Sequence, residues 1–167
     1  MKYRVIVPVF AAALVLQPFL NTLLPWGAAP ELIVSSGLML CLFFESEKVL
    51  PVLITGSVME LLSDMAGAQY AGFSVIAFVL AVSLVIFVRQ FTNIENFIVA
   101  AGIYLAAILL YYVLIWILYA MAGSPYGFIY AMSKIPAAVI GNFVFGMILY
   151  IIFLVRLNRH RRDRYFR

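Results

Sequence analysis

The sequence predicts an all-α integral membrane protein, a compact bundle of about six transmembrane helices with both termini on the cytoplasmic side. Hydrophobic residues occupy 66% of the 167 positions and charged residues only 11%, whereas soluble domains are about 45–50% apolar and about 25% charged. The apolar runs are also continuous, because no charge occurs within residues 5–30, 65–88 or 96–133. Such runs favour helices over the alternating strands of a transmembrane barrel, and the composition excludes disorder.

The length of the chain sets the number of helices. At about 20 residues per spanning helix, the chain holds about six and leaves no room for an aqueous domain. We expect a transmembrane domain over residues 1–157 and a basic cytoplasmic tail over residues 158–167. Charges, Gly/Pro turns and run lengths place the helices at residues 5–24, 30–44, 49–65, 70–88, 97–121 and 126–157.

The first three expected helices end at turn or charge signals. The first ends at Pro25-Trp26-Gly27, and the second stops at the charged segment 45–48. The third carries Glu60 and Asp64 in its outer half. The second and third are the shortest, at about 15–17 residues, so they could be tilted, re-entrant or matched to a thinner bilayer.

The last three expected helices differ in their charges. The fourth ends at Arg89, and the fifth is the longest and carries no charge. The sixth holds Lys134 and runs into the basic tail. That tail either anchors the topology at an anionic lipid surface or meets a partner.

Orientation follows from Lys and Arg, which stay on the cytoplasmic side of a membrane. Six helices put both termini and two connections on one side, together with 10 of the 11 basic residues. The sequence therefore predicts a multi-pass, N-in and C-in topology. The basic residues on that side are Lys2, Arg4, Lys48, Arg89, Arg156, Arg159, Arg161, Arg162, Arg164 and Arg167.

Three ionisable side chains lie inside the expected spans, where each costs about 2.5–3.5 kcal/mol and marks function or a specific pairing. Glu60 and Asp64 are four residues apart and share a helix face. Two like charges at this spacing disfavour each other, so either one carboxyl stays protonated or a cation compensates both. Lys134 is a candidate for that cation, and the alternative is that it extends along its helix towards the outer surface.

Small and polar residues accompany these charges. Gly56, Ser63 and Gly67 lie on the same face as Glu60, and Asn142 follows a run of small residues in the sixth helix. Small residues let helices approach closely, and polar groups hydrogen-bond between them. This pattern indicates packing within the bundle. The alternative is a groove that binds another transmembrane protein or a small ligand.

The sequence contains no recognisable catalytic motif. His160 and Cys41 are the only histidine and cysteine, so no multi-cysteine or histidine metal cluster can form. Nucleophile-elbow, phosphate-loop and zinc-protease motifs are missing as well. We therefore expect a protein that is not an enzyme, holds no cofactor and binds no nucleic acid.

The segment from Thr55 to Asp64 carries a family resemblance. Gly56, Glu60 and Leu61, followed by Gly67 and Gly72, resemble the Gly-x-x-x-Asp-Leu signature and glycines of MreD, the bacterial rod-shape-determining membrane protein, with Glu in place of Asp. The likeness extends over the chain in length and helix count. It includes Gln17, the segment Pro30-Glu31-Leu32, and Asn142 ahead of a basic tail.

The resemblance implies a non-enzymatic subunit of the cell-elongation machinery in the bacterial cytoplasmic membrane. Its expected partners are a single-span MreC-like protein, MreB and the RodA/penicillin-binding-protein synthase of lateral peptidoglycan. Gly56, Glu60 and Asp64 would then form a structural or partner-binding face.

The alternative is the substrate-binding component of an energy-coupling-factor vitamin transporter, to which the MreD family is similar in fold. A vitamin would then bind in a pocket formed by Glu60, Asp64, Lys134, Trp26 and Tyr70.

Overall fold

The computed structural model describes residues 6–24, 29–44, 49–67, 70–92, 94, 96–124 and 128–165. Their regular structure is entirely helical, and six helices follow one another along the chain, which confirms the all-α prediction. They are α1 (Ile6–Leu23), α2 (Leu32–Phe43), α3 (Val49–Gly67), α4 (Phe73–Arg89), α5 (Phe97–Met121) and α6 (Phe128–Tyr165).

Four of the described helices are long and apolar enough to cross a membrane, namely α1, α3, α5 and the Met132–Val155 part of α6. The two others are apolar but shorter, with 12 residues in α2 and 17 in α4. At about 1.5 Å per residue, α2 extends about 18 Å, against a hydrocarbon layer of about 30 Å. The chain therefore has the helices of a membrane protein, with one clearly short element.

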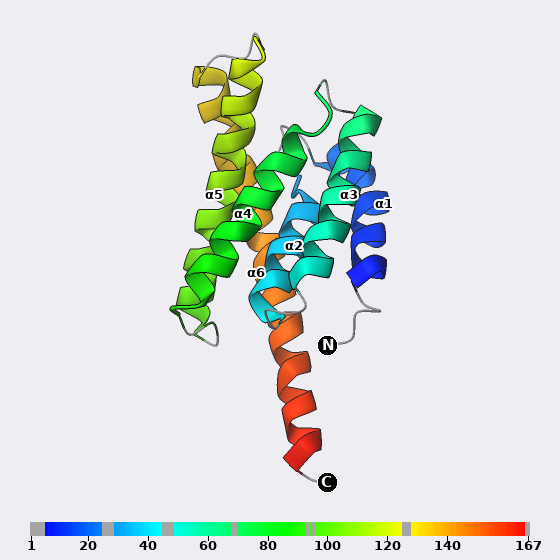
Figure 1. Cartoon of the computed structure of the whole chain (residues 1–167), viewed down its shortest axis with the longest axis vertical. Helices are drawn as coiled ribbons and strands as arrows, with labels where there is room; N and C mark the ends of the chain where they lie inside the picture. Colours follow the sequence, from blue (N-terminus) through cyan, green and yellow to red (C-terminus); the bar gives the residue numbers. More distant parts are fainter. Residues whose placement is uncertain are drawn as a thin grey trace.

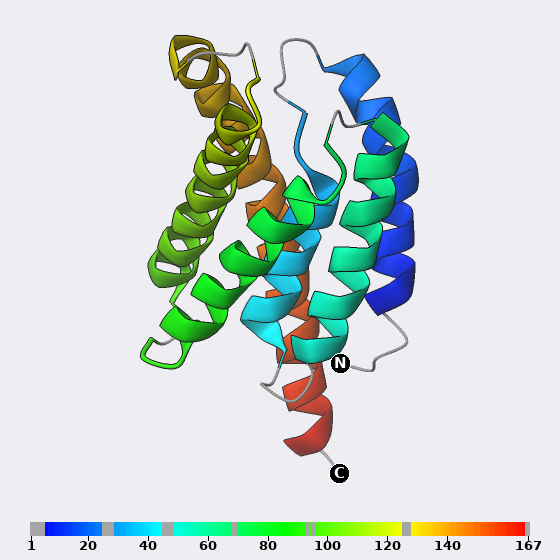
Figure 2. The same cartoon turned by 45° about the horizontal axis from the view of Figure 1, so that its top comes forward.

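The short helix α2 lies at the centre of the bundle (Figures 1 and 2). It contacts all five other helices, and every residue from Leu32 to Leu42 is buried. A helix that is apolar on all sides is stable only when it is covered on all sides. The surrounding helices instead expose large apolar side chains, such as Phe19 on α1 and Met65 on α3, as helices facing lipid do.

The helices run alternately up and down, so that α1 begins at the same end of the bundle at which α6 finishes (Figure 1). Arg89, the last residue of α4, belongs to this end as well. We call it the basic end, and the opposite end, where α3 finishes and α4 begins, the far end. Lys2, Arg4, Lys48 and Arg167, which also entered the topology prediction, lie outside the described residues.

The described helices begin and end within three residues of their expected bounds, except at the C-terminal end of α6. α2 begins at Leu32 instead of residue 30, and α4 begins at Phe73 instead of residue 70 because Gly72 adopts a left-handed conformation with φ of 94°. α6 continues to Tyr165 through residues predicted as a tail. The reason is that no Gly or Pro follows Gly146, and arginine is a good helix former.

Candidate functional site

The N-terminal end of α2 lies inside the bundle, where its first backbone N–H groups have no partner within the helix. The Leu32 N–H donates to Gln17 Oε1 of α1 at 2.6 Å, and the Gln17 amide nitrogen donates to the Pro30 carbonyl at 3.0 Å. The Glu31 N–H donates to Asn142 Oδ1 of α6 at 2.9 Å. The side-chain amides of Gln17 and Asn142 therefore satisfy the backbone hydrogen-bonding groups at the start of α2. Water cannot do so inside a bilayer.

Asn142 of α6 also forms hydrogen bonds with residues of α2 and α5. It is fully buried, and its Oδ1 also accepts a hydrogen bond from the Ser35 hydroxyl at 2.6 Å. Its side-chain amide nitrogen donates to Tyr112 Oη of α5 at 2.7 Å, and its backbone carbonyl oxygen accepts from the Tyr104 hydroxyl at 3.0 Å. Asn142 thus links α2, α5 and α6 through buried hydrogen bonds, which agrees with the interpretation that the polar residues of the sixth helix serve packing within the bundle.

The other end of α2 is held by Arg89. Its guanidinium donates to the carbonyl oxygens of Cys41 and Phe44, in the last turn and at the C-cap of α2. A basic side chain at a helix C-terminus satisfies free carbonyls and complements the helix dipole. The sequence indicated Arg89 only as a topology signal, because its partner helix lies about 45 residues earlier in the chain.

Gly56 allows a close crossing of helices. A Cβ atom at Gly56 would lie 2.5 Å from the Phe78 ring of α4 and 3.1 Å from the Phe10 ring of α1. A Cβ at Gly37 of α2 would meet the same Phe78 ring, also at 2.5 Å. The Phe78 ring therefore occupies space that two glycines leave open, the role of small residues in membrane bundles.

Asp64 is buried, and its role is structural. Its Oδ2 accepts hydrogen bonds from the backbone N–H groups of Gly72 at 2.9 Å and Ser74 at 3.2 Å. These are free donors at the start of α4, so the Asp64 carboxylate caps that helix from the preceding one. Gly67 ends α3 just before the turn.

Glu60 lies one helical turn before Asp64 and is equally buried, with 3% of its surface exposed. Among the described residues, no group donates a hydrogen bond to its Oε1. In the described part of the chain, the charged groups that act on it are two further carboxyls, Glu31 and Asp64. The hydroxyl of Ser57, three residues earlier, also has no hydrogen-bond partner in the described part of the chain.

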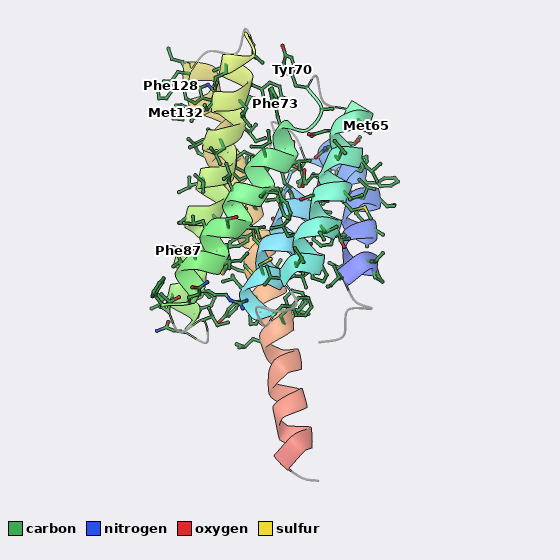
Figure 3. All side chains as sticks on the ribbon, viewed as in Figure 1. Met65, Tyr70, Phe73, Phe87, Phe128 and Met132 are labelled. Atoms are coloured by element: carbon green, nitrogen blue, oxygen red, sulfur yellow. The ribbon has the colours of Figure 1, made fainter. Side chains whose placement is uncertain are left out.

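The structure does not bring Lys134 to Glu60. At the far end, α6 lies beside α5, and α4 separates this pair from α3 (Figures 1 and 2). Met132, two residues before Lys134, and Met65, near the end of α3, lie on opposite sides of the bundle (Figure 3). The sequence matched the depths of Lys134 and Glu60 along their helices, but it carries no information on their lateral separation.

The sequence pointed to Gly56, Asp64 and Asn142, and in the structure these residues serve helix packing and capping. It also pointed to Glu60, whose Oε1 has no described hydrogen-bond partner. It missed Glu31 as a neighbour of Glu60 and Arg89 as the cap of α2. Trp26, named for the vitamin pocket, lies outside the described residues. No group of three His, Cys, Asp or Glu side chains able to hold a metal ion occurs within the described ranges.

The apolar helices and the buried hydrogen bonds are those of a helical membrane protein. Its short central helix, α2, is held at both ends by side chains of α1, α4 and α6. No protein-family model matches the chain, and the searches of curated proteins and of solved structures gave no match.

Proposed function

We propose that this chain is a multi-pass protein of the bacterial cytoplasmic membrane and a non-enzymatic subunit of the cell-elongation machinery. It crosses the membrane six times, with both termini in the cytoplasm, and binds a single-span MreC-like partner. MreB and the RodA/penicillin-binding-protein synthase are its further partners by the same resemblance.

The observation that carries this proposal is the role of the α3 motif. Gly56 permits the crossing with Phe78, and Asp64 caps α4 across the turn that Gly72 makes. Gly56 and Gly72, two of the residues that resemble the MreD pattern, therefore serve the packing of α3 against α4, and Asp64, which lies between them in the sequence, caps α4. Structural residues of this kind support a scaffold subunit, although the acid of the pattern, Glu60, receives no described hydrogen bond at Oε1.

The six-span topology is supported by the arrangement of the helices. α2 and α4 are short, but each runs antiparallel to the helices before and after it in the chain, and α2 begins inside the bundle (Figure 2). Arg89 at the basic end agrees with the rule that basic residues stay inside. A cysteine introduced at Ser124, in the turn after α5, should be labelled from outside the cell, and labelling only from the cytoplasm would contradict this topology.

The partner is tested by purifying the tagged full-length chain from its own cells in mild detergent. We expect mass spectrometry to find a single-span MreC-like protein in comparable amount. Depletion of the chain should also turn rod-shaped cells round and remove peptidoglycan synthesis along the side wall. Unchanged cell shape after depletion, together with the absence of such a partner, would contradict the proposal.

One observation favours a second candidate, the substrate-binding component of a vitamin transporter. The unpartnered Glu60 oxygen, close to Glu31, is a feature that a ligand-binding interior would have. The same purification separates the two functions, because a vitamin transporter component would retain a vitamin at nanomolar affinity and co-purify with transporter subunits in place of the MreC-like protein.

A further inference from the structure

We propose that the interior between α2, α3 and α5 binds a primary ammonium group through Glu60. This inference goes beyond the role in cell elongation, and neither depends on the other. It begins with the Glu60 carboxyl, which is 3% exposed and whose Oε1 receives no hydrogen bond from any described residue. Buried polar groups are nearly always paired, so this oxygen indicates a partner that the described chain does not supply.

The position of the Glu60 side chain follows from its burial. Glu60 is 3% exposed, so its carboxyl lies inside the bundle and not against the lipid. Tyr111 and Tyr112 of α5, and Glu31 at the start of α2, are within electrostatic range of it. Ser57, three residues earlier on the same helix face, adds a buried hydroxyl oxygen without a described hydrogen-bond partner.

The charge of this region selects a cation. Among the residues that the structure describes, the ionisable side chains within range of Glu60 on the neighbouring elements are the carboxyls Glu31 and Asp64 and the phenols Tyr111 and Tyr112. Asp64 is occupied by the backbone of α4. The first N–H groups of α2 are occupied by Gln17 and Asn142, so they do not serve as donors to Glu60.

An ammonium group suits these acceptors better than a metal ion. Divalent metals need several oxygen ligands at short distance, and no group of three metal-binding side chains exists in the described ranges. An alkylammonium has three N–H donors. The carboxylate of Glu60 and the hydroxyl of Ser57 offer acceptors on one helix face, and Tyr111 of α5 is within electrostatic range of Glu60.

The far end of the bundle carries an aromatic cluster that offers an approach for a cation. The Tyr70 and Phe73 rings stack with centroids 5.2 Å apart, and Tyr119 meets both edge-on at 5.5 and 5.6 Å. Tyr70 and Phe73 lie at the top of α4 (Figure 3), and Tyr119 is within electrostatic range of Asp64. Aromatic faces beside a carboxylate attract ammonium groups.

A primary ammonium could come from a free amine or from the ethanolamine headgroup of a lipid, and the test separates these sources. The full-length chain is placed in nanodiscs of phosphatidylcholine and phosphatidylglycerol. Ethylammonium chloride is titrated at constant ionic strength, with sodium chloride and tetramethylammonium chloride as controls. Calorimetry and the thermal unfolding midpoint report binding, and a second set of nanodiscs contains phosphatidylethanolamine.

We expect saturable binding of ethylammonium and no binding of tetramethylammonium, which lacks N–H donors. Glu60→Gln should weaken binding at least 10-fold without lowering the unfolding midpoint of the free protein, and Ser57→Ala should weaken it several-fold. Weaker ethylammonium binding in nanodiscs with phosphatidylethanolamine assigns the site to the lipid headgroup, and unchanged binding assigns it to a free amine. Absence of saturable binding by the wild type, or equal binding by Glu60→Gln, overturns the proposal, whether or not an MreC-like partner co-purifies.

Discussion

Glu60 and Asp64 lie one helical turn apart on α3 and are almost equally buried, at 3% and 4% exposure. Their surroundings differ sharply. Asp64 accepts two backbone hydrogen bonds at the start of α4, whereas no described residue donates to Glu60 Oε1. An acidic residue inside a membrane is by default a candidate for function. The comparison teaches that the hydrogen-bond partners, and not the burial, separate a structural acid from a candidate binding residue.

The largest difference between the two acids should appear on truncation. Asp64→Ala leaves the partly buried Gly72 and Ser74 N–H groups without their acceptor. An unsatisfied donor costs about 1–3 kcal/mol when it is fully buried and less when it is partly buried. We expect a clearly lower thermal unfolding midpoint in detergent and a lower yield of folded protein.

Asp64→Asn is the matched control, because its side-chain carbonyl can still accept from the same donors. It should recover much of the lost stability. An unfolding midpoint for Asp64→Ala equal to that of the wild type would mean that the cap contributes nothing, and the two acids would no longer differ in stability.

The junction that positions both acids is tested by Gly56→Ala. The new methyl group would lie 2.5 Å from the Phe78 ring, which is fully buried and has Phe10 beside it. Overpacking of this kind costs about 1–3 kcal/mol, and the unfolding midpoint should fall accordingly. Adding Phe78→Leu, which removes the ring, should restore part of the loss.

Gly102→Ala in α5 is the control for this prediction. A Cβ at Gly102 meets nothing within 4 Å, so alanine should be neutral or slightly stabilising because it is the better helix former. Equal losses at Gly56 and Gly102 would show that the crossing with Phe78 is not the cause.

Much of this difference could not be predicted from the sequence. The six helices, the face shared by Gly56, Glu60 and Asp64, and the buried Asn142 follow from hydropathy and from spacing. Whether an acid finds hydrogen-bond donors depends on the turn after α3. In that turn Gly72, with its φ of 94°, brings the first N–H groups of α4 to Asp64. Spacing along one helix carries no information about such a turn.

The neighbours of Glu60 show the same limit. Glu31 comes close to it because α2 begins inside the bundle, and a sequence pattern gives the start of a helix but not its depth. Lys134 matched Glu60 in depth, but α6 lies beside α5, and Lys134 is not among the described charged groups that act on Glu60. Pairing between helices requires their lateral order, which one sequence read alone does not supply.

Gly72→Ala tests the turn that gives Asp64 its role. The left-handed conformation costs a residue with a Cβ atom about 1–2 kcal/mol, and no atom lies within 4 Å to add a clash. We expect a smaller fall in the unfolding midpoint than for Asp64→Ala. Gly72→Asn should lose less than Gly72→Ala because asparagine tolerates this conformation, and the opposite order of the two variants would argue against a conformational cause.

The smallest effect should come from the other member of the pair. Glu60→Gln keeps the shape of the side chain and removes a carboxyl that receives no hydrogen bond at Oε1 from the described residues. Because no described hydrogen bond to that oxygen is lost, we expect the unfolding midpoint of the ligand-free protein to stay within the range of a neutral substitution, about 0.5 kcal/mol, or to rise. A fall comparable to that of Asp64→Ala would mean that Glu60 is a structural residue as well. Measured in the same detergent and on the same day as Asp64→Ala, this variant therefore decides whether α3 carries one structural acid or two.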